Sequence, residues 1–65
     1  MILEAKEVLT SDYYIALPSR YQIHDYDIMQ QFCRSVENDD DSEVLLDAII
    51  GAGAFRRYIT LIRRL

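Results

Sequence analysis

The strongest constraint on this chain is that its 65 residues include only one cysteine and one histidine. A chain of this length buries about 60% of the surface that its unfolded form exposes, and its hydrophobic core then contributes roughly 3–5 kcal/mol. Cys33 has no second cysteine for an intrachain disulfide, and His24 has no second soft ligand for a metal. We therefore expect no metal and no cofactor. Self-association, or additional sequence that completes the fold, would supply the missing stability.

The composition is that of a folded globular chain, with 51% hydrophobic residues, one proline and two glycines. No apolar run approaches the ~20 residues of a membrane span, and the N-terminus lacks the basic-then-apolar pattern of a signal peptide. With the free thiol of Cys33, these features predict a cytoplasmic protein that does not enter a membrane. We expect residues 1–65 to form one small domain.

Charge is distributed unevenly along the chain. The net charge of −4 disfavours nucleic acid as the default partner. All eleven acidic residues lie in residues 1–50, whereas residues 51–65 contain four basic residues and no acidic one. The four are Arg56, Arg57, Arg63 and Arg64. This asymmetry indicates either an anion-binding end or two parts of one fold that neutralise each other.

The first predicted helix covers residues 25–36. Asp25 is a suitable N-cap, and Pro18 ends a β-favouring stretch over residues 13–17 that we expect to be extended. Residues 2–9 favour neither the helical nor the strand period and are read as a short helix or a strand. The apolar residues of the helix recur at helical spacing; they are Ile28, Met29, Phe32, Cys33 and Val36.

Two further helices are predicted over residues 43–50 and 54–65. Asp40 and Glu43 have the spacing of a capping box, with Ser42 as the rival cap. Gly51 lies where a helix ends in a left-handed residue, so residues 51–53 should form a tight connection between two helices. The predicted fold is mainly all-α: a three-helix domain that contains a helical hairpin and begins with a short extended or helical segment.

The helical periods also predict which side chains are buried. The predicted core consists of Ile28, Met29, Phe32, Val36, Leu45, Ala48, Ile49, Phe55, Ile59 and Ile62. In the last helix Tyr58 shares the apolar stripe, whereas in the 43–50 helix the stripe begins at Val44. Leu46, Ile50, Leu61 and Leu65 flank these stripes and would form a second apolar surface. A two-fold homodimer, or a further segment of chain, would cover that surface.

Two stretches resemble a known family. They are Leu17-Pro18-Ser19-Arg20-Tyr21-Gln22-Ile23-His24-Asp25-Tyr26-Asp27-Ile28-Met29-Gln30-Gln31-Phe32-Cys33 and Gly51-Ala52-Gly53-Ala54-Phe55-Arg56-Arg57-Tyr58. In order and spacing they are similar to the motifs of an uncharacterised bacterial family, number 0158 among the uncharacterised protein families, over roughly residues 15–65. The resemblance implies a small helical protein and names no activity. Family members commonly carry a basic residue where this chain has Ala52, and they commonly continue into a tryptophan-containing helix. This chain is therefore read as a short variant or as a fragment truncated at its C-terminus.

The arginines are the strongest candidate site. Arg56, Arg57, Arg63 and Arg64 fall on one side of the last helix and could clamp phosphate or carboxylate groups. The alternative, which we favour, is a solvated face paired with Asp47 and with the acidic run 39–41. Gly51 and Gly53 precede a helix N-terminus, but they lack the spacing of a phosphate-binding loop and follow a helix, so we interpret them as a structural turn.

The remaining candidates have simpler explanations. His24 and Asp25 are sequence neighbours and favour capping over acid–base chemistry, and residues 39–41 lack the glycine and the terminal glutamate of a calcium loop. Cys33 lies on an apolar face and should be inert. The chain is thus predicted to be a non-catalytic protein-interaction or self-associating module, and the alternative is nucleic-acid or anion binding through the arginine face. Interface tyrosines would support the first reading; the candidates are Tyr13, Tyr14, Tyr21 and Tyr26.

Overall fold

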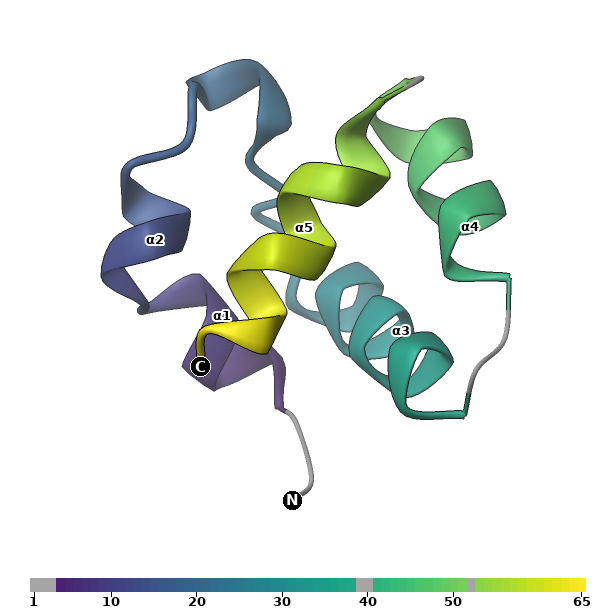
Figure 1. Cartoon of the computed structure of the whole chain (residues 1–65), viewed down its shortest axis with the longest axis horizontal. Helices are drawn as coiled ribbons and strands as arrows, with labels where there is room; N and C mark the ends of the chain where they lie inside the picture. The colour runs from purple at the N-terminus through teal and green to yellow at the C-terminus, as the bar shows by residue number, and fades with distance from the viewer. Residues whose placement is uncertain (1–3, 39–40, 52) are drawn as a thin grey trace.

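A computed structural model describes residues 4–38, 41–51 and 53–65. Within these residues it contains five α-helices and no β-strand, which confirms the predicted all-α class. The helix α5 crosses the front of the molecule, with α1 and α2 on one side and α3 and α4 on the other (Figure 1). The elements are α1 (Ala5–Leu9), α2 (Asp12–Ile15), the 3-10 turn η1 (Ser19–Tyr21), α3 (Tyr26–Glu37), α4 (Ser42–Ile49) and α5 (Ala54–Arg63).

The N-terminal part is more helical than predicted. Residues 12–15 form α2, so the extended segment expected over residues 13–17 is wrong. The Ser11 hydroxyl explains the difference, because it accepts a hydrogen bond from the Tyr14 amide at 3.2 Å and caps the helix. The buried ring of Tyr14 provides tertiary packing that outweighs the β preference of the sequence. The ambiguous segment 2–9 is helical as α1, although residues 2 and 3 lie outside the described residues.

The caps of the three predicted helices explain where those helices begin and end. Asp25 is the N-cap of α3, and its carboxylate accepts a hydrogen bond from the Ile28 amide at 3.1 Å. Asp41 is the N-cap of α4 without a side-chain hydrogen bond, and the predicted capping role of Asp40 lies outside the described residues. Gly51 and Gly53 have φ of 110° and 88°, which confirms that the connection uses left-handed conformations.

The core is centred on different faces of α4 and α5 than predicted. Met29 and Phe32 are buried as expected, but on α4 the buried apolar residue is Leu46, and Ala48 and Ile49 are exposed. The predicted inward positions of Val44, Ala48 and Ile49 are therefore wrong, because all three are exposed. Six of the eight positions from 43 to 50 are apolar, so the sequence pattern alone could not select the inward face. Half-buried side chains pack around the core; from the prediction these are Ile28, Val36, Leu45, Phe55 and Ile62.

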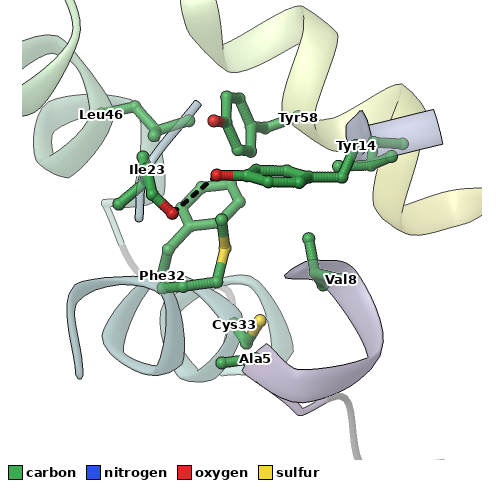
Figure 2. Packing of buried hydrophobic residues seen from close by; sticks show 10 residues of the cluster. Ala5, Val8, Tyr14, Ile23, Phe32, Cys33, Leu46 and Tyr58 are labelled. Carbon is green, nitrogen blue, oxygen red and sulfur yellow. Dashed lines mark hydrogen bonds between the residues drawn. The ribbon is translucent and has the colours of Figure 1, made fainter. Parts of the chain in front are cut away.

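On α5 the inward line is Ala54, Tyr58 and Leu61, and Ile59 is only half-buried. Because Leu61 and Leu46 are both buried, the second apolar surface predicted for a two-fold dimer does not exist in that form. The orientation of α5 is fixed by the ring of Tyr58, which packs edge-on against Phe32 with a centroid distance of 5.6 Å. Tyr58 also lies edge-on to Tyr14, at 6.5 Å (Figure 2).

Two buried tyrosine hydroxyls hold the segment between α2 and α3. Tyr14 donates a hydrogen bond to the Ile23 carbonyl at 2.7 Å (Figure 2), and Tyr58 donates to the Tyr21 carbonyl. Burial raises the pKa of both phenols above the ordinary tyrosine value, so the neutral donors are the stable forms. Gln22 adds a third attachment, since its amide donates to the Leu17 carbonyl at 3.0 Å. Side chains from α2 and α5 thus fix a segment that has little regular structure of its own.

Candidate anion-binding groove

A groove of about 490 Å³ runs between α2 and α5. We call it the α2–α5 groove. Its walls combine three guanidinium groups with a hydroxyl, two aliphatic side chains and an aromatic ring. The lining residues are Tyr13, Leu17, Gly53, Arg56, Arg57, Thr60, Leu61 and Arg64.

The helical repeat explains why the arginines gather on this flank. At about 100° per residue, Arg57 and Arg64 lie on the side of α5 next to the buried line of Tyr58 and Leu61, and Arg56 lies farther round on the exposed side. Burial of that line turns the flank towards α2. Three of the four arginines predicted as an anion-binding face therefore line one groove. Arg63 is exposed and is not among the lining residues.

Aromatic rings position two of these arginines. The guanidinium carbon of Arg57 lies 4.4 Å from the ring centroid of Tyr21, and that of Arg64 lies 5.5 Å from the centroid of Tyr13. Such cation–π contacts contribute about 0.5–1 kcal/mol at exposed sites and restrict the motion of a long side chain. Arg20, which sequence reasoning did not include, also lies over Tyr21, at 4.9 Å. Arg20 therefore adds a positive charge to those of the three lining arginines, because it contacts the same ring as Arg57.

The groove arginines are not neutralised by the acidic residues of the chain, as far as the structure describes it. No carboxylate in residues 4–38, 41–51 and 53–65 pairs with Arg56, Arg57 or Arg64. Asp47, which was expected to pair with this face, is on α4, and α4 lies on the opposite side of α5 from α2 (Figure 1). The acidic residues 39 and 40 lie outside the described residues.

The floor of the groove is apolar. Leu61 is buried and Leu17 is half-buried, while the ring of Tyr13 is 45% exposed at the edge. Among the lining residues, only Thr60 and Tyr13 carry a side-chain hydroxyl. A ligand that fits this site combines negative charge with an apolar group. Guanidiniums bind carboxylates and phosphates through paired N–H donors, so either anion satisfies the polar rim.

A second hollow, of about 640 Å³, lies beside α3 and has the opposite charge. Its lining is mostly polar and contains three carboxylates and one guanidinium. The lining residues are Glu4, Tyr26, Asp27, Gln30, Gln31, Arg34 and Glu37. Within the described residues, no group of three histidine, cysteine or acidic side chains could hold a metal ion. The basic and acidic hollows therefore lie on different helices.

The other sequence candidates have structural roles or none. Asp25 caps α3, and His24 is exposed beside it. Cys33 is a buried free thiol whose pKa is raised to about 11, mainly by burial and further by the nearby carboxylates of Glu37 and Glu7. The thiolate, which is the reactive form, is therefore scarce at neutral pH. Gly51 and Gly53 form the turn between α4 and α5, as predicted.

No protein family, curated protein or solved structure matches this chain. The resemblance to uncharacterised family 0158 therefore stays a prediction that rests on its two motifs. Among the described residues, none of the helices has the length and hydropathy needed to cross a bilayer.

Proposed function

We propose that this chain is a non-catalytic interaction module that binds a carboxylate-bearing protein segment in the α2–α5 groove. The observation that carries the proposal is the set of three guanidiniums, on Arg56, Arg57 and Arg64, that line an apolar floor without a carboxylate partner among the described residues. Two of them are held against aromatic rings, so part of the entropic cost of ordering them is already met before a ligand arrives.

The composition of the groove favours a protein segment over nucleic acid. The chain carries a net charge of −4, which repels a polyanion at long range. Leu17 and Leu61 offer contacts to an aliphatic side chain, and a phosphate backbone has no group that uses them. An amphipathic segment that presents an aliphatic residue between two carboxylates would use both the floor and the rim.

The test uses a synthetic helical peptide that displays leucine between two glutamates one turn apart. Its control is the same peptide with glutamine in place of both glutamates. Binding is followed by NMR through the side-chain Nε–H signals of the arginines. We expect the acidic peptide to shift the signals of Arg56, Arg57 and Arg64, and we expect the control peptide to bind about tenfold more weakly. Equal binding of the two peptides would contradict the proposal.

Matched variants separate the groove from the general charge of α5. R56Q/R64Q removes two groove guanidiniums, whereas R63Q removes one that does not line the groove. Only R56Q/R64Q should weaken binding of the acidic peptide. A single-stranded oligonucleotide, measured at about 50 mM and about 500 mM salt, tests the alternative of nucleic-acid binding. Tighter binding of the oligonucleotide, with a steep salt dependence that R56Q/R64Q reduces, would replace the present proposal.

The compartment belongs to the same proposal. A free, buried thiol at Cys33 supports a reducing, cytoplasmic setting, because an oxidising compartment favours paired cysteines. Recovery of the thiol in the reduced form from intact cells would support this setting, and recovery as a mixed disulfide would oppose it.

A further inference from the structure

The outward side of α4 forms a ridge that has the chemistry required by the groove. Val44 is 65% exposed, and the exposed carboxylates of Glu43 and Asp47 stand one helical turn apart beside it. We call these three residues the α4 ridge. Leu46, on the inward side of the same helix, is buried, so the packing of α4 keeps the ridge in solvent. At about 100° per residue, Val44 lies to one side of the two carboxylates, so the outer surface of the helix presents an exposed aliphatic side chain next to a carboxylate pair.

We infer that the segment bound in the α2–α5 groove is the α4 ridge of a second copy of this chain. Val44 matches the apolar floor made by Leu17 and Leu61, and the carboxylates of Glu43 and Asp47 match the guanidiniums on the rim. This inference rests on the proposed function, because it names the partner of the same groove. Burying an exposed valine favours the contact, and so does pairing charges that have no ion-pair partner among the described residues.

The geometry makes this association head to tail. The groove lies between α2 and α5, and α4 lies on the far side of α5 (Figure 1). One copy therefore cannot place its own ridge in its own groove. Each copy has one free ridge and one free groove, so the contact joins two different surfaces and generates chains or rings. It differs from the two-fold dimer, which required Leu46 and Leu61 on the surface, where they are not.

The acidic hollow beside α3 is a poorer partner for the groove. It carries carboxylates on Glu4, Asp27 and Glu37, but it is concave, and Tyr26 is its only apolar lining residue. Two hollows cannot fill each other, and the floor of the groove would stay in water. The α4 ridge is convex and carries the valine, so it satisfies both requirements.

The size of the contact predicts weak association. One ridge in one groove buries less than about 1,200 Å² of total surface, which is the range of transient contacts. Its rim is ionic and exposed, so salt should weaken it. We therefore expect self-association at high protein concentration and low salt, with an average mass that rises past the dimer because the contact does not close on itself.

The experiment is sedimentation equilibrium of the full chain from about 20 μM to about 1 mM at low salt, a range that brackets weak dissociation constants. The groove variant is R56Q/R64Q, and the ridge variant is E43Q/D47N. E43Q/D47N replaces exposed carboxylates by amides of the same shape, and R56Q/R64Q replaces exposed guanidiniums by shorter neutral amides. R63Q and D27N are the matched controls, because neither residue belongs to the groove or the ridge. Thermal melting of each variant confirms that it is folded.

We expect the groove variant and the ridge variant each to dissociate about tenfold more readily than the wild type. Mixed in equal amounts, they should form 1:1 dimers and nothing larger, because only one intact groove and one intact ridge can meet. The controls should associate like the wild type. A mixture that stays monomeric, or a ridge variant that associates normally, would overturn the inference.

The outcome is independent of the peptide experiment. A wild-type chain that stays monomeric at about 1 mM while it binds the acidic peptide would overturn the second-copy partner and leave the proposed function standing. A chain that neither self-associates nor binds the acidic peptide would overturn both the second-copy partner and the proposed function. Association that persists at about 500 mM salt and in R56Q/R64Q would show an apolar interface elsewhere, which also contradicts the inference.

Discussion

The connection between α2 and α3 and the hairpin of α4 and α5 are stabilised in different ways. The connection, residues 16–25, contains only the short turn η1. Its backbone carbonyls accept hydrogen bonds from the buried hydroxyls of Tyr14 and Tyr58 and from the side-chain amide of Gln22. The hairpin forms most of its backbone hydrogen bonds within its two helices, and it packs on the core through apolar side chains such as Leu46. Directional hydrogen bonds allow one arrangement, whereas apolar packing allows a helix to rotate. An irregular segment can therefore be the more precisely fixed part of a small protein.

The largest expected effect comes from a residue on which both regions depend. Phe32 is fully buried in α3 and contacts the ring of Tyr58. Phe32→Ala should cost about 3–5 kcal/mol, which is comparable with the whole stability of a domain of this size. Chemical denaturation followed by circular dichroism measures it. A variant with an unchanged denaturation midpoint would show that the two regions do not share this core.

High pH should act mainly on the connection. The pKa values of Tyr14 and Tyr58 are raised in the folded state by burial. Their stabilising contribution is therefore complete below the unfolded tyrosine pKa of about 10 and is lost as the pH rises above it. We expect the melting temperature to fall steeply above about pH 10, and we expect the phenolate absorbance of the two buried tyrosines to rise only as the chain unfolds. Titration of all five tyrosines before any loss of helix would contradict this.

Removal of one hydroxyl tests the connection alone. Tyr58→Phe keeps the ring contacts with Phe32 and Tyr14 but leaves the Tyr21 carbonyl without its donor. The cost should be about 1–3 kcal/mol, since an unsatisfied buried acceptor loses its full hydration. Tyr13→Phe, on an exposed ring, is the matched control and should change the free energy of unfolding by less than about 0.5 kcal/mol. Equal effects of the two substitutions would remove the distinction drawn between the two regions.

The smallest expected effect concerns the hairpin turn. Gly51 has φ of 110°, and a Cβ there would meet no atom within 4 Å. Gly51→Ala should therefore cost about 1 kcal/mol from backbone strain alone, without a steric clash. A Gly51 variant carrying D-alanine, made by chemical synthesis, relieves the strain and should recover the wild-type midpoint. A large loss with either enantiomer would reveal a contact at this turn.

Local signals in the sequence predicted the helices better than they predicted packing. Asp25 and Gly51 mark helix ends through their own backbone chemistry, and the structure has both ends within one residue of prediction. The α2 helix was missed although Ser11, its N-cap, and Asp12 give a usable start signal. The inward face of α4 was mispredicted because apolar residues surround nearly the whole helix, so tertiary contacts decide its rotation.

The candidate site divides in the same way. Spacing on one helix grouped four arginines on one side of α5, and three of them, Arg56, Arg57 and Arg64, line the groove. Tyr13 and Tyr21, which hold two of them, come from segments more than 35 residues earlier in the chain. A single sequence has no signal for that pairing. The same holds for Arg20, whose place beside the groove arginines depends on how the connection folds back.

Because Cys33 is buried, the rate at which its thiol is modified reports how often the structure around it opens. Figure 2 shows Cys33 beside Ala5 of α1, which is five residues long and is tied to α3 by a hydrogen bond from the Ala5 amide to Gln30 at 3.0 Å. A thiol reagent can reach the sulfur only while α1 is lifted from α3 or the chain is unfolded. The modification rate, compared with that of the denatured chain, therefore gives the combined fraction of time for which α1 is open or the whole chain is unfolded. That fraction can be measured on the wild-type sequence, because Cys33 is its only cysteine and no further probe has to be introduced.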